Sequence, residues 1–549
     1  MQGSDRPTPI SIDTGKVQGA YRTDAAGGRV IEYRGIPFAE SPSGDLRWEL
    51  PKTKTAWTGT FDASDFGPAC PQVKRFNLTD ASNNEDCLSI NITAPADLKQ
   101  GEKLPVLFWI HGGAFVGGSS NLYRLDKLAN QGRMVVVTAN YRLGFLGFVP
   151  LPALANNPVN GNFGIEDQRE AMRWVQRNIS KFGGDPKNIT VSGESAGAAS
   201  VCMHLASPDK VNGLFHKAII MSAGCLAHIK SVDQAISTSG TEISNNLDCP
   251  NNGKQLACLR NKPIEQILAV QTKYANANAT DLAIFAPVYG TANSTPPRPN
   301  ATIPTSIADA LSQSKGGKFL PVPTLIGGEQ KEILLYVGYW WQAGQTGALP
   351  VNTTTVLSSW LPNFYGKKAN AVAVKYGFKK NLSDTASAEK LGVALSDYND
   401  SIGINNCLYY KTADTIQAYP GAKPLYVFEF ADPNALVNGV GISTPYPNFS
   451  MGPVHSAIIN YVFPGYSNNS KINAPALPAD SELLSEQIVQ YWSKFVSSGN
   501  PASSNLPSWP TYAKNTKSIM KFAPNQVGLF NGHNAHHCGF WKSQYPKNL

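Results

Sequence analysis

One serine stands between two glycines in the segment Gly193-Glu194-Ser195-Ala196-Gly197, a spacing that suits a nucleophile. The β-branched run 188–191 before it predicts a strand, and the small residues 196–200 after it can begin a helix packed on a sheet. A serine on so sharp a turn needs neighbours without bulk, which glycine supplies. The start of the helix leaves free N–H groups, including that of Ala196, to face a developing negative charge. The pattern predicts a serine nucleophile; a glycine-rich turn around a buried serine is the alternative.

The hydrophobic pattern around this serine predicts a mostly parallel sheet with helices on both faces. Short apolar runs indicate buried strands at 105–110, 134–139, 217–222, 323–327 and 424–430. Helical spacing of apolar side chains predicts helices at 167–182 and 480–497. Residues 10–12, 15–19 and 30–33 alternate and break like a small antiparallel sheet. Because no repeat or linker interrupts the chain, we expect one α/β domain over residues 1–549 with long loop insertions.

Composition excludes several classes of protein. A hydrophobic content of 42% and a charged content of 16% suit a folded chain of 549 residues rather than a disordered one. The net charge is +8, but no dense Lys/Arg run supports nucleic-acid binding. No apolar run approaches the roughly 18 residues of a membrane span. Composition does not indicate the oligomeric state.

Six further motifs accompany the serine segment. They are YRGIPFA (33–39), EDCLSIN (85–91), WIHGGAF (109–115), NFGIEDQ (162–168), FGGDP (182–186) and CGFW (538–541). Together they resemble the type-B carboxylesterase/lipase family, the branch of the α/β-hydrolases that includes cholinesterases, fungal lipases and secreted fungal carboxylesterases. The resemblance covers nearly the whole chain. It implies the α/β-hydrolase fold, a central, mostly parallel twisted sheet covered by helices, and hydrolysis of carboxylic esters.

In this fold the nucleophile is followed along the chain by an acid and then a histidine. His455 lies in a loop before the apolar run 458–463, where the resemblance places the family's histidine. Two acids follow the predicted strand 323–327. The resemblance favours Glu332, but Lys331 and Ile333 replace the family's flanking Asp and Gly, so Glu329 stays open as the alternative. The resemblance also assigns an oxyanion hole to the backbone N–H groups of Gly113, Ala114 and Ala196.

These residues imply an acyl-enzyme mechanism without a metal or organic cofactor. His455 would take the Ser195 proton as Ser195 attacks an ester carbonyl, while Glu332 orients His455. His533, His536, His537 and Cys538 look like metal ligands, but their spacing fits no regular zinc pattern. A non-catalytic binding module of the same superfamily is the competing class, and the presence of all three triad residues argues against it.

Eight cysteines and many Asn-x-Ser/Thr sites predict a secreted protein whose signal peptide has been removed or replaced. A cytosolic protein with free thiols is the alternative. The resemblance implies disulfides Cys70–Cys87 and Cys249–Cys258, and a third, Cys407–Cys538, as in cholinesterases. Cys202 and Cys225 are expected to be buried free thiols, with a fourth bridge left open. The sequons considered are Asn77, Asn91, Asn278, Asn293, Asn300, Asn352, Asn381 and Asn468.

In the family that this chain resembles, the loop closed by the first disulfide influences the substrate class: lipases have a long amphipathic lid there, and cholinesterases a tryptophan for choline. In this chain the loop lies between Cys70 and Cys87. It contains no tryptophan for a choline group, few apolar residues for a lipase lid, and a sequon at Asn77. Lys74 and Arg75 would also disfavour a cationic alcohol. We therefore expect an esterase for soluble, short-to-medium acyl esters, with a lipase or sterol esterase as the alternative. The aromatic residues 339–341 are predicted either to line a substrate gorge or to pack in the core.

Overall fold

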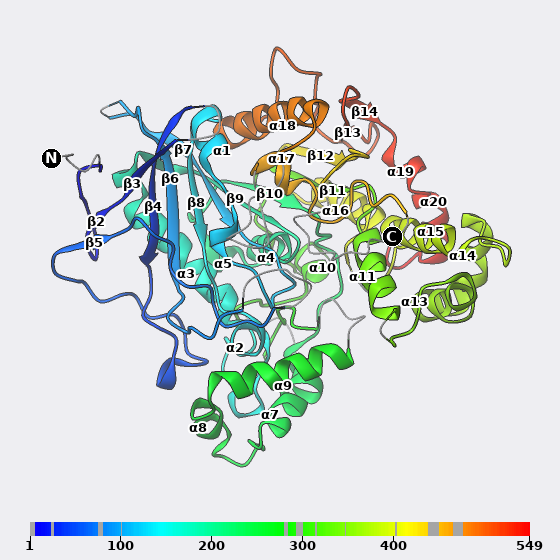
Figure 1. Cartoon of the computed structure of the whole chain (residues 1–549), viewed down its shortest axis with the longest axis horizontal. Helices are drawn as coiled ribbons and strands as arrows, with labels where there is room; N and C mark the ends of the chain where they lie inside the picture. The colour runs from blue at the N-terminus through cyan, green and yellow to red at the C-terminus, as the bar shows by residue number, and fades with distance from the viewer. Residues whose placement is uncertain are drawn as a thin grey trace.

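A sheet of eleven strands forms the centre of the described part of the molecule (Figure 1). The computed structural model describes residues 6–23, 27–74, 81–99, 101–278, 284–291, 300–312, 314, 316–345, 347–400, 403–436, 449–464 and 476–549. The strand order is β14-β13-β12-β11-β10-β9-β7-β8-β6-β4-β3. The bounds are β3 Ala20–Thr23, β4 Arg29–Pro37, β6 Ser89–Pro95, β7 Leu104–Ile110, β8 Val135–Ala139, β9 Gly184–Glu194, β10 Lys217–Met221, β11 Thr324–Glu329, β12 Leu425–Phe430, β13 Ile519–Phe522 and β14 Gly528–Phe530.

The middle of this sheet is parallel, as the apolar runs predict. Every neighbouring pair from β13 to β8 is parallel, whereas β14 at one edge and β6, β4 and β3 at the other pair antiparallel. The carboxyl ends of the parallel strands therefore meet at one edge of the sheet, where the segments after β7, β9 and β11 come together.

Helices cover both faces of the sheet because side chains alternate along each strand. On β7, Leu107 and Trp109 pack into the core under α18 (Ala479–Ser498) and α1 (Asp126–Gln131). Val106, Phe108 and Ile110 pack into the opposite core with α3 (Phe163–Asn178) and α4 (Ala196–Leu205). The helices predicted at 167–182 and 480–497 are thus α3, with a 3₁₀ turn at Ile179–Phe182, and α18.

The N-terminal sheet differs in part from its prediction. β1 (Ile10–Ile12) and β2 (Gly15–Gln18) pair antiparallel as expected, but the third strand is β5 (Thr60–Asp62), which is parallel to β2. The expected third segment, 30–33, lies in β4 of the large sheet and pairs with β6. Val30, Tyr33 and Ile36 of β4 are buried, so this strand gains more apolar burial in the large sheet than in a small, half-exposed one.

A third hydrophobic core lies beside the sheet, around α11 (Leu334–Gly344) and α15 (Asp384–Asp397), and it includes Trp541 near the C-terminus. Figure 1 shows these helices and α13 and α14 gathered next to the C-terminal segment. Further helices are α2 Gly144–Phe148, α7 Thr241–Asn246, α8 Gln255–Arg260, α9 Ile264–Ala277, α13 Leu361–Tyr365, α14 Ala369–Tyr376, α16 Asn406–Ala418, α17 Ile459–Val462 and α20 Cys538–Gln544. No described helix is both long and apolar enough to cross a bilayer.

All eight cysteines form disulfides. Cys70–Cys87, Cys249–Cys258 and Cys407–Cys538 pair as the resemblance implies. The expectation of free thiols at Cys202 and Cys225 is wrong, because these two residues form the fourth bridge. Cys202 lies on α4, which packs on β10, and Cys225 follows β10, so their Cα atoms are only 5.2 Å apart, within reach of a disulfide.

One of the sequons is unsuited to glycosylation. The Asn91 side chain is 2% exposed in β6, accepts a hydrogen bond from the N–H of Gly35 and donates to the hydroxyls of Ser120 and Thr138. Asn300 and Asn381 are exposed. Asn77, Asn293 and Asn468 lie outside the described residues.

Candidate active site

Ser195 occupies a strained turn between β9 and α4. Its backbone angles are φ 56° and ψ −122°, a left-handed conformation that non-glycine residues rarely adopt. A Cβ on Gly193 would lie 2.4 Å from the carbonyl carbon of Gly197, and one on Gly197 would lie 2.0 Å from the oxygen of Ile110. The two glycines are therefore required sterically, and the turn holds the half-buried Ser195 at the carboxyl edge of the sheet.

The structure brings Ser195, His455 and Glu332 together from three separate segments. His455 Nε2 lies 2.8 Å from Ser195 Oγ, and His455 Nδ1 lies 2.7 Å from Glu332 Oε2. Glu332 stands in the turn after β11, and His455 stands in the loop before α17; the N–H of His455 also donates to the backbone oxygen of Glu332. Such a chain of contacts can move a proton from a hydroxyl to an imidazole held by a carboxylate.

Of the two candidate acids, Glu332 contacts His455 and Glu329 does not. The second oxygen of Glu332, Oε1, accepts hydrogen bonds from the N–H of Glu329 at 2.9 Å and from the Tyr409 hydroxyl at 2.8 Å. Glu329 instead accepts a hydrogen bond from the hydroxyl of Ser222 at Oε2 and from the N–H of Ile458 at Oε1. Burial raises the pKa of Glu332 to about 7 and raises the pKa of Glu329 well above its ordinary value.

Glu194, the residue before the serine, also reaches His455, which the sequence pattern did not indicate. Its Oε1 lies 3.3 Å from His455 Nε2 and accepts a hydrogen bond from the Ser456 hydroxyl at 2.6 Å. The side chain is 2% exposed, and burial raises its pKa to about 8. Two buried carboxyl groups therefore contact one imidazole, and a third, that of Glu329, lies within 4.8 Å of it. Glu194 occupies the first variable position of the G-x-S-x-G pattern. Its role could have been inferred from the sequence only if its contacts with His455 and Ser456 had been known.

The segment after β7 turns sharply beside the serine. Gly113, Ala114 and Phe115 all have positive φ angles, and a Cβ on Gly113 would lie 2.1 Å from the oxygen of Gly117. Ala114, Ser195 and Ala196 line the same small cavity. Among the described residues, no hydrogen bond uses the backbone N–H groups of Gly113, Ala114 or Ala196. These donors are free to bind an oxyanion at the serine.

His111 supports the start of this segment rather than the chemistry. Its ring stacks on Tyr141 with centroids 4.3 Å apart, and the Tyr141 hydroxyl donates to the backbone oxygen of His111. Burial lowers the pKa of His111 to about 4, so the ring is neutral at physiological pH.

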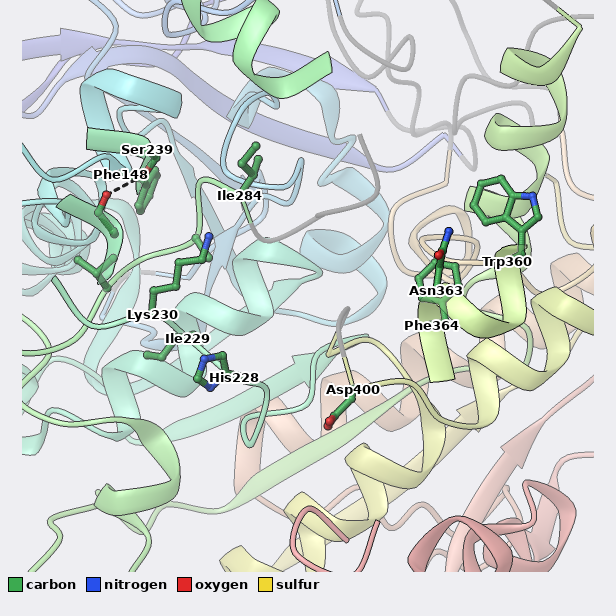
Figure 2. A pocket seen from close by; sticks show the side chains of 13 residues that line it. Phe148, His228, Ile229, Lys230, Ser239, Ile284, Trp360, Asn363, Phe364 and Asp400 are labelled. Atoms are coloured by element: carbon green, nitrogen blue, oxygen red, sulfur yellow. Dashed lines mark hydrogen bonds between the residues drawn. The ribbon is translucent and has the colours of Figure 1, made fainter. Parts of the chain in front are cut away.

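A small cavity opens at the serine and adjoins a larger one. The smaller, about 90 Å³, is lined by Ser195 and by small residues such as Ala199, Ala223 and Gly224, with Tyr336 beside them. The larger, about 530 Å³, has His228 and Ile229 in common with the smaller. Figure 2 shows His228, Ile229 and Lys230 on one side of the larger cavity and Trp360, Asn363 and Phe364 across from them. Tyr336, His228 and Trp360 are lining residues that the sequence pattern did not indicate.

The aromatic residues 339–341 pack in the core, which is one of their two predicted roles, and line neither of the two cavities. Tyr339 and Trp340 are each 8% exposed and belong to the third hydrophobic core, with Trp340 stacked on Trp360. Trp341 packs edge-on against Phe449. Trp360, Phe364 and Phe148, rather than 339–341, are the aromatic residues that line the larger cavity.

One group of side chains has the spacing of a metal site. Ligand atoms of Glu329, Glu332 and His455 all lie within 4.8 Å of one another. However, Nδ1 of His455 is engaged by Glu332 and Nε2 by Ser195, so both ring nitrogens already have hydrogen-bond partners. We interpret the group as a hydrogen-bonded proton-transfer cluster.

The histidines near the C-terminus have structural contacts instead. His536 is buried between Asp397 and Glu429, each 2.6 Å away, and Cys538 is in the disulfide to Cys407. Burial lowers the pKa of His536, but the two carboxylates outweigh this and raise it to about 10. His533 lies 3.1 Å from the Tyr512 hydroxyl.

Comparisons with known proteins identify the family to which the chain belongs. The carboxylesterase family model matches residues 6–541. The human protein named cocaine esterase is 30% identical, with 100% of this chain and 93% of that protein covered. Fumonisin B1 esterase of Sphingopyxis macrogoltabida is 31% identical over 92% of this chain and 85% of its own length. The solved structure of a PNB esterase superposes with a TM-score of 0.74 at 28% identity and covers 97% of this chain and 99% of its own. The chain therefore belongs to the carboxylesterase family, and it is a carboxylic ester hydrolase with the α/β-hydrolase fold.

Proposed function

We propose that this esterase works through an acyl-enzyme formed on Ser195. His455 removes the Ser195 proton as Oγ attacks the ester carbonyl, and the N–H groups of Gly113, Ala114 and Ala196 stabilise the oxyanion. His455 then protonates the leaving alcohol, and a water molecule, deprotonated by His455, releases the acid. Glu332 orients His455 and stabilises its charged form. The observation that carries the proposal is the position of His455, within 2.8 Å of Ser195 Oγ and 2.7 Å of Glu332 Oε2.

The test is Ser195→Ala, assayed on a soluble p-nitrophenyl ester. We expect kcat to fall on the order of 10⁵- to 10⁶-fold, as for other serine nucleophiles, with the thermal unfolding curve preserved because only one hydroxyl is lost. A fluorophosphonate probe should label the parent enzyme at this serine and leave the variant unlabelled. Turnover by the folded variant at more than a few per cent of the parent rate would exclude Ser195 as the nucleophile.

We further infer that the substrates are soluble esters with a short-to-medium acyl group. Support comes from the small cavity at Ser195, whose walls carry alanine and glycine, and from the larger cavity next to it, whose about 530 Å³ falls in the usual range for small-molecule sites. The smaller cavity would hold the acyl group and the larger one the remainder of the ester. Arg75 and Asn77, which bear on this expectation, lie outside the described residues.

Secretion is our inference from the four disulfides, since such bonds persist in oxidising compartments. The exposed sequons Asn300 and Asn381 are the expected glycosylation sites among the described residues. Peptide mapping of the protein from its natural source tests this: glycans at these positions are expected, and reduced thiols throughout would contradict secretion.

A further inference from the structure

The cluster around His455 holds more acid than one imidazole can balance. Glu194, Glu329 and Glu332 are each at most 2% exposed. In the part of the chain that the structure describes, no lysine or arginine forms an ion pair with any of them, and the nearby Lys331 pairs with Glu389 instead. Buried charges without partners are costly, so the three groups cannot all be ionised together at modest cost.

Hydrogen bonding distinguishes Glu332 from Glu329. Glu332 accepts from a backbone N–H and from a phenol and faces His455, so its negative charge is stabilised on both oxygens. Glu329 receives the Ser222 hydroxyl and a longer bond of 3.3 Å from the N–H of Ile458. Oxygen atoms of the Glu329 and Glu332 carboxyl groups lie within 4.8 Å of each other. Of two carboxyl groups this close, the one with fewer donors is the one that keeps a proton.

We propose that Glu329 is a positioning residue of the esterase site: it remains protonated at neutral pH and, as a neutral acid, donates to Glu332, which keeps Glu332 ionised opposite His455. This rests on the proposed role of Glu332 as the triad acid. The residue that sequence comparison left as an alternative acid thus has a different task, that of a hydrogen-bond donor. A carboxyl held neutral by burial can donate in this way at physiological pH.

The groups that face Glu329 support this assignment. They are Glu332 on the following turn, Glu194 at the end of β9, His455 on the loop before α17, Tyr409 on α16 and Tyr336 on α11. Burial raises the pKa of Glu329, Glu332 raises it further, and His455 opposes both. In the other direction, hydrogen bonding to Glu329 lowers the pKa of Glu332, against the effect of burial.

Two substitutions separate the donor from the charge. Neither Glu329→Gln nor Glu329→Leu can carry a negative charge, but Glu329→Gln keeps a neutral N–H donor of similar size, whereas Glu329→Leu removes the donor. For each full-length variant, kcat and KM are measured for a soluble acetate ester from about pH 5 to pH 10. The acid limb of kcat/KM reports the coupled ionisation of Glu332 and His455 in the free enzyme.

We expect Glu329→Gln to keep kcat/KM within about threefold of the parent and to leave the acid limb in place. Glu329→Leu should move the acid limb up by about one pH unit. Without the donor from residue 329, the negative charge of Glu332 acts more strongly on His455 and favours its imidazolium form. Activity at pH 7 should fall about fivefold in kcat with little change in KM, and recover as the pH rises. General damage to the site would not recover with pH.

A shift of the acid limb of kcat/KM to lower pH in both variants would overturn the proposal. If Glu329 were ionised, Gln and Leu would each remove a negative charge, and both acid limbs would move down together. If Glu329→Leu does not fold, the Gln variant alone decides, and infrared difference spectra between the parent and this variant at pH 7 should show the carbonyl band of a protonated carboxyl. Glu332→Gln distinguishes failure of the proposed triad from failure of the role of Glu329. If Glu332→Gln retains parent activity, the proposed triad is wrong. If Glu332→Gln is inactive and Glu329→Gln shifts the acid limb, only the role of Glu329 is wrong.

Discussion

At the scale of single residues, the site keeps carboxyl groups where their charge is disfavoured. Burial raises the pKa of Glu332 to about 7 and that of Glu194 to about 8. A carboxyl whose pKa is raised on folding stabilises the fold below its unfolded pKa, near 4.5, and that stabilisation is lost as the pH rises through the folded value. The proposed chemistry needs Glu332 ionised, so the pH at which the enzyme is most active should lie above the pH at which it is most stable.

We therefore expect esterase activity to rise through about pH 7 while the free energy of unfolding falls between about pH 5 and 8. Urea unfolding at half-unit pH steps measures the second quantity. Glu194→Gln is the matched control, because its amide does not titrate and its stability should decline less steeply over this interval. Equal slopes for the parent and the variant would show that Glu194 does not titrate in this range.

The positions of some site residues could be predicted from the sequence, and those of others could not. Ser195 stands in a local motif whose two glycines are required because a Cβ there would lie 2.4 Å or 2.0 Å from backbone atoms. The motif is therefore enough to predict the sharp turn at Ser195. Choosing between Glu332 and Glu329 required the direction of two side chains three residues apart. The contact of Glu329 with Ser222 joins β11 to the end of β10, 107 residues away along the chain, and no local pattern encodes it.

At the scale of elements, the turn that carries Glu332 is held by the helices beside it. The N–H of Ile333 donates to Ser396 Oγ on α15. The side-chain amide of Asn406, at the start of α16, donates to the backbone oxygens of Glu329 and Gln330. The next residue, Cys407, is bonded to Cys538. The disulfide to the C-terminal helix thus fixes the end of α16 that supports the acid turn.

Removing this disulfide should lower both stability and turnover. The bond closes a loop of 131 residues, and the chain-entropy estimate for that length is about 5 kcal/mol, against about 2.6 kcal/mol for the 9-residue separation of Cys249–Cys258. The test compares the double serine variants of the two pairs by urea unfolding and by kcat. We expect a larger stability loss and a lower kcat for the Cys407/Cys538 variant, and a near-parent kcat for the other. Equal kcat values for the two variants would show that the Cys407–Cys538 disulfide does not support the turn that carries Glu332.

Helices and strands could be predicted where their buried side chains recur at a regular spacing within one short segment. The stripe of Leu484, Ile488 and Trp492 predicts α18 because one helix face alone packs on the sheet. The strand 30–33 was assigned to the wrong sheet, because the choice of partner is made by β6, some 60 residues later in the chain. The Cys202–Cys225 bridge stayed only an alternative to free thiols for the same reason, since it depends on how closely α4 packs on β10.

At the scale of the whole molecule, the active-site cavities lie among residues of the sheet's carboxyl edge and of the third hydrophobic core. Ser195 and Ala114 come from segments that follow β9 and β7, whereas Trp360 and Phe364 come from the helical region beside the sheet. The described exposed apolar side chains are scattered over separate segments, among them Phe66, Val374 and Leu529. Such single residues are ordinary on a protein surface and offer no reason to expect adsorption to oil.

The loop between Cys70 and Cys87 is tied down at its base. The backbones of Gln72 and Ser82 exchange two hydrogen bonds, of 2.8 and 2.9 Å. The buried side chain of Gln72 also donates to the backbone oxygen of Gly118 and accepts from its N–H. Only residues 73–81 extend beyond this pairing, too few for a long amphipathic lid that opens onto a lipid surface.

The corresponding prediction is that activity does not respond to an oil–water interface. Tributyrin is titrated through its solubility limit by continuous acid release, with triolein run in parallel and Ser195→Ala as the blank for uncatalysed hydrolysis. The rate should saturate with dissolved tributyrin and continue without a step when the emulsion forms, because the nine residues 73–81 between the paired Gln72 and Ser82 are too few for an amphipathic lid. Triolein should be turned over at least about tenfold more slowly, since its acyl chains exceed the cavity of about 90 Å³ at the serine. A jump in rate at the solubility limit, or triolein turned over as fast as tributyrin, would place this enzyme among the lipases.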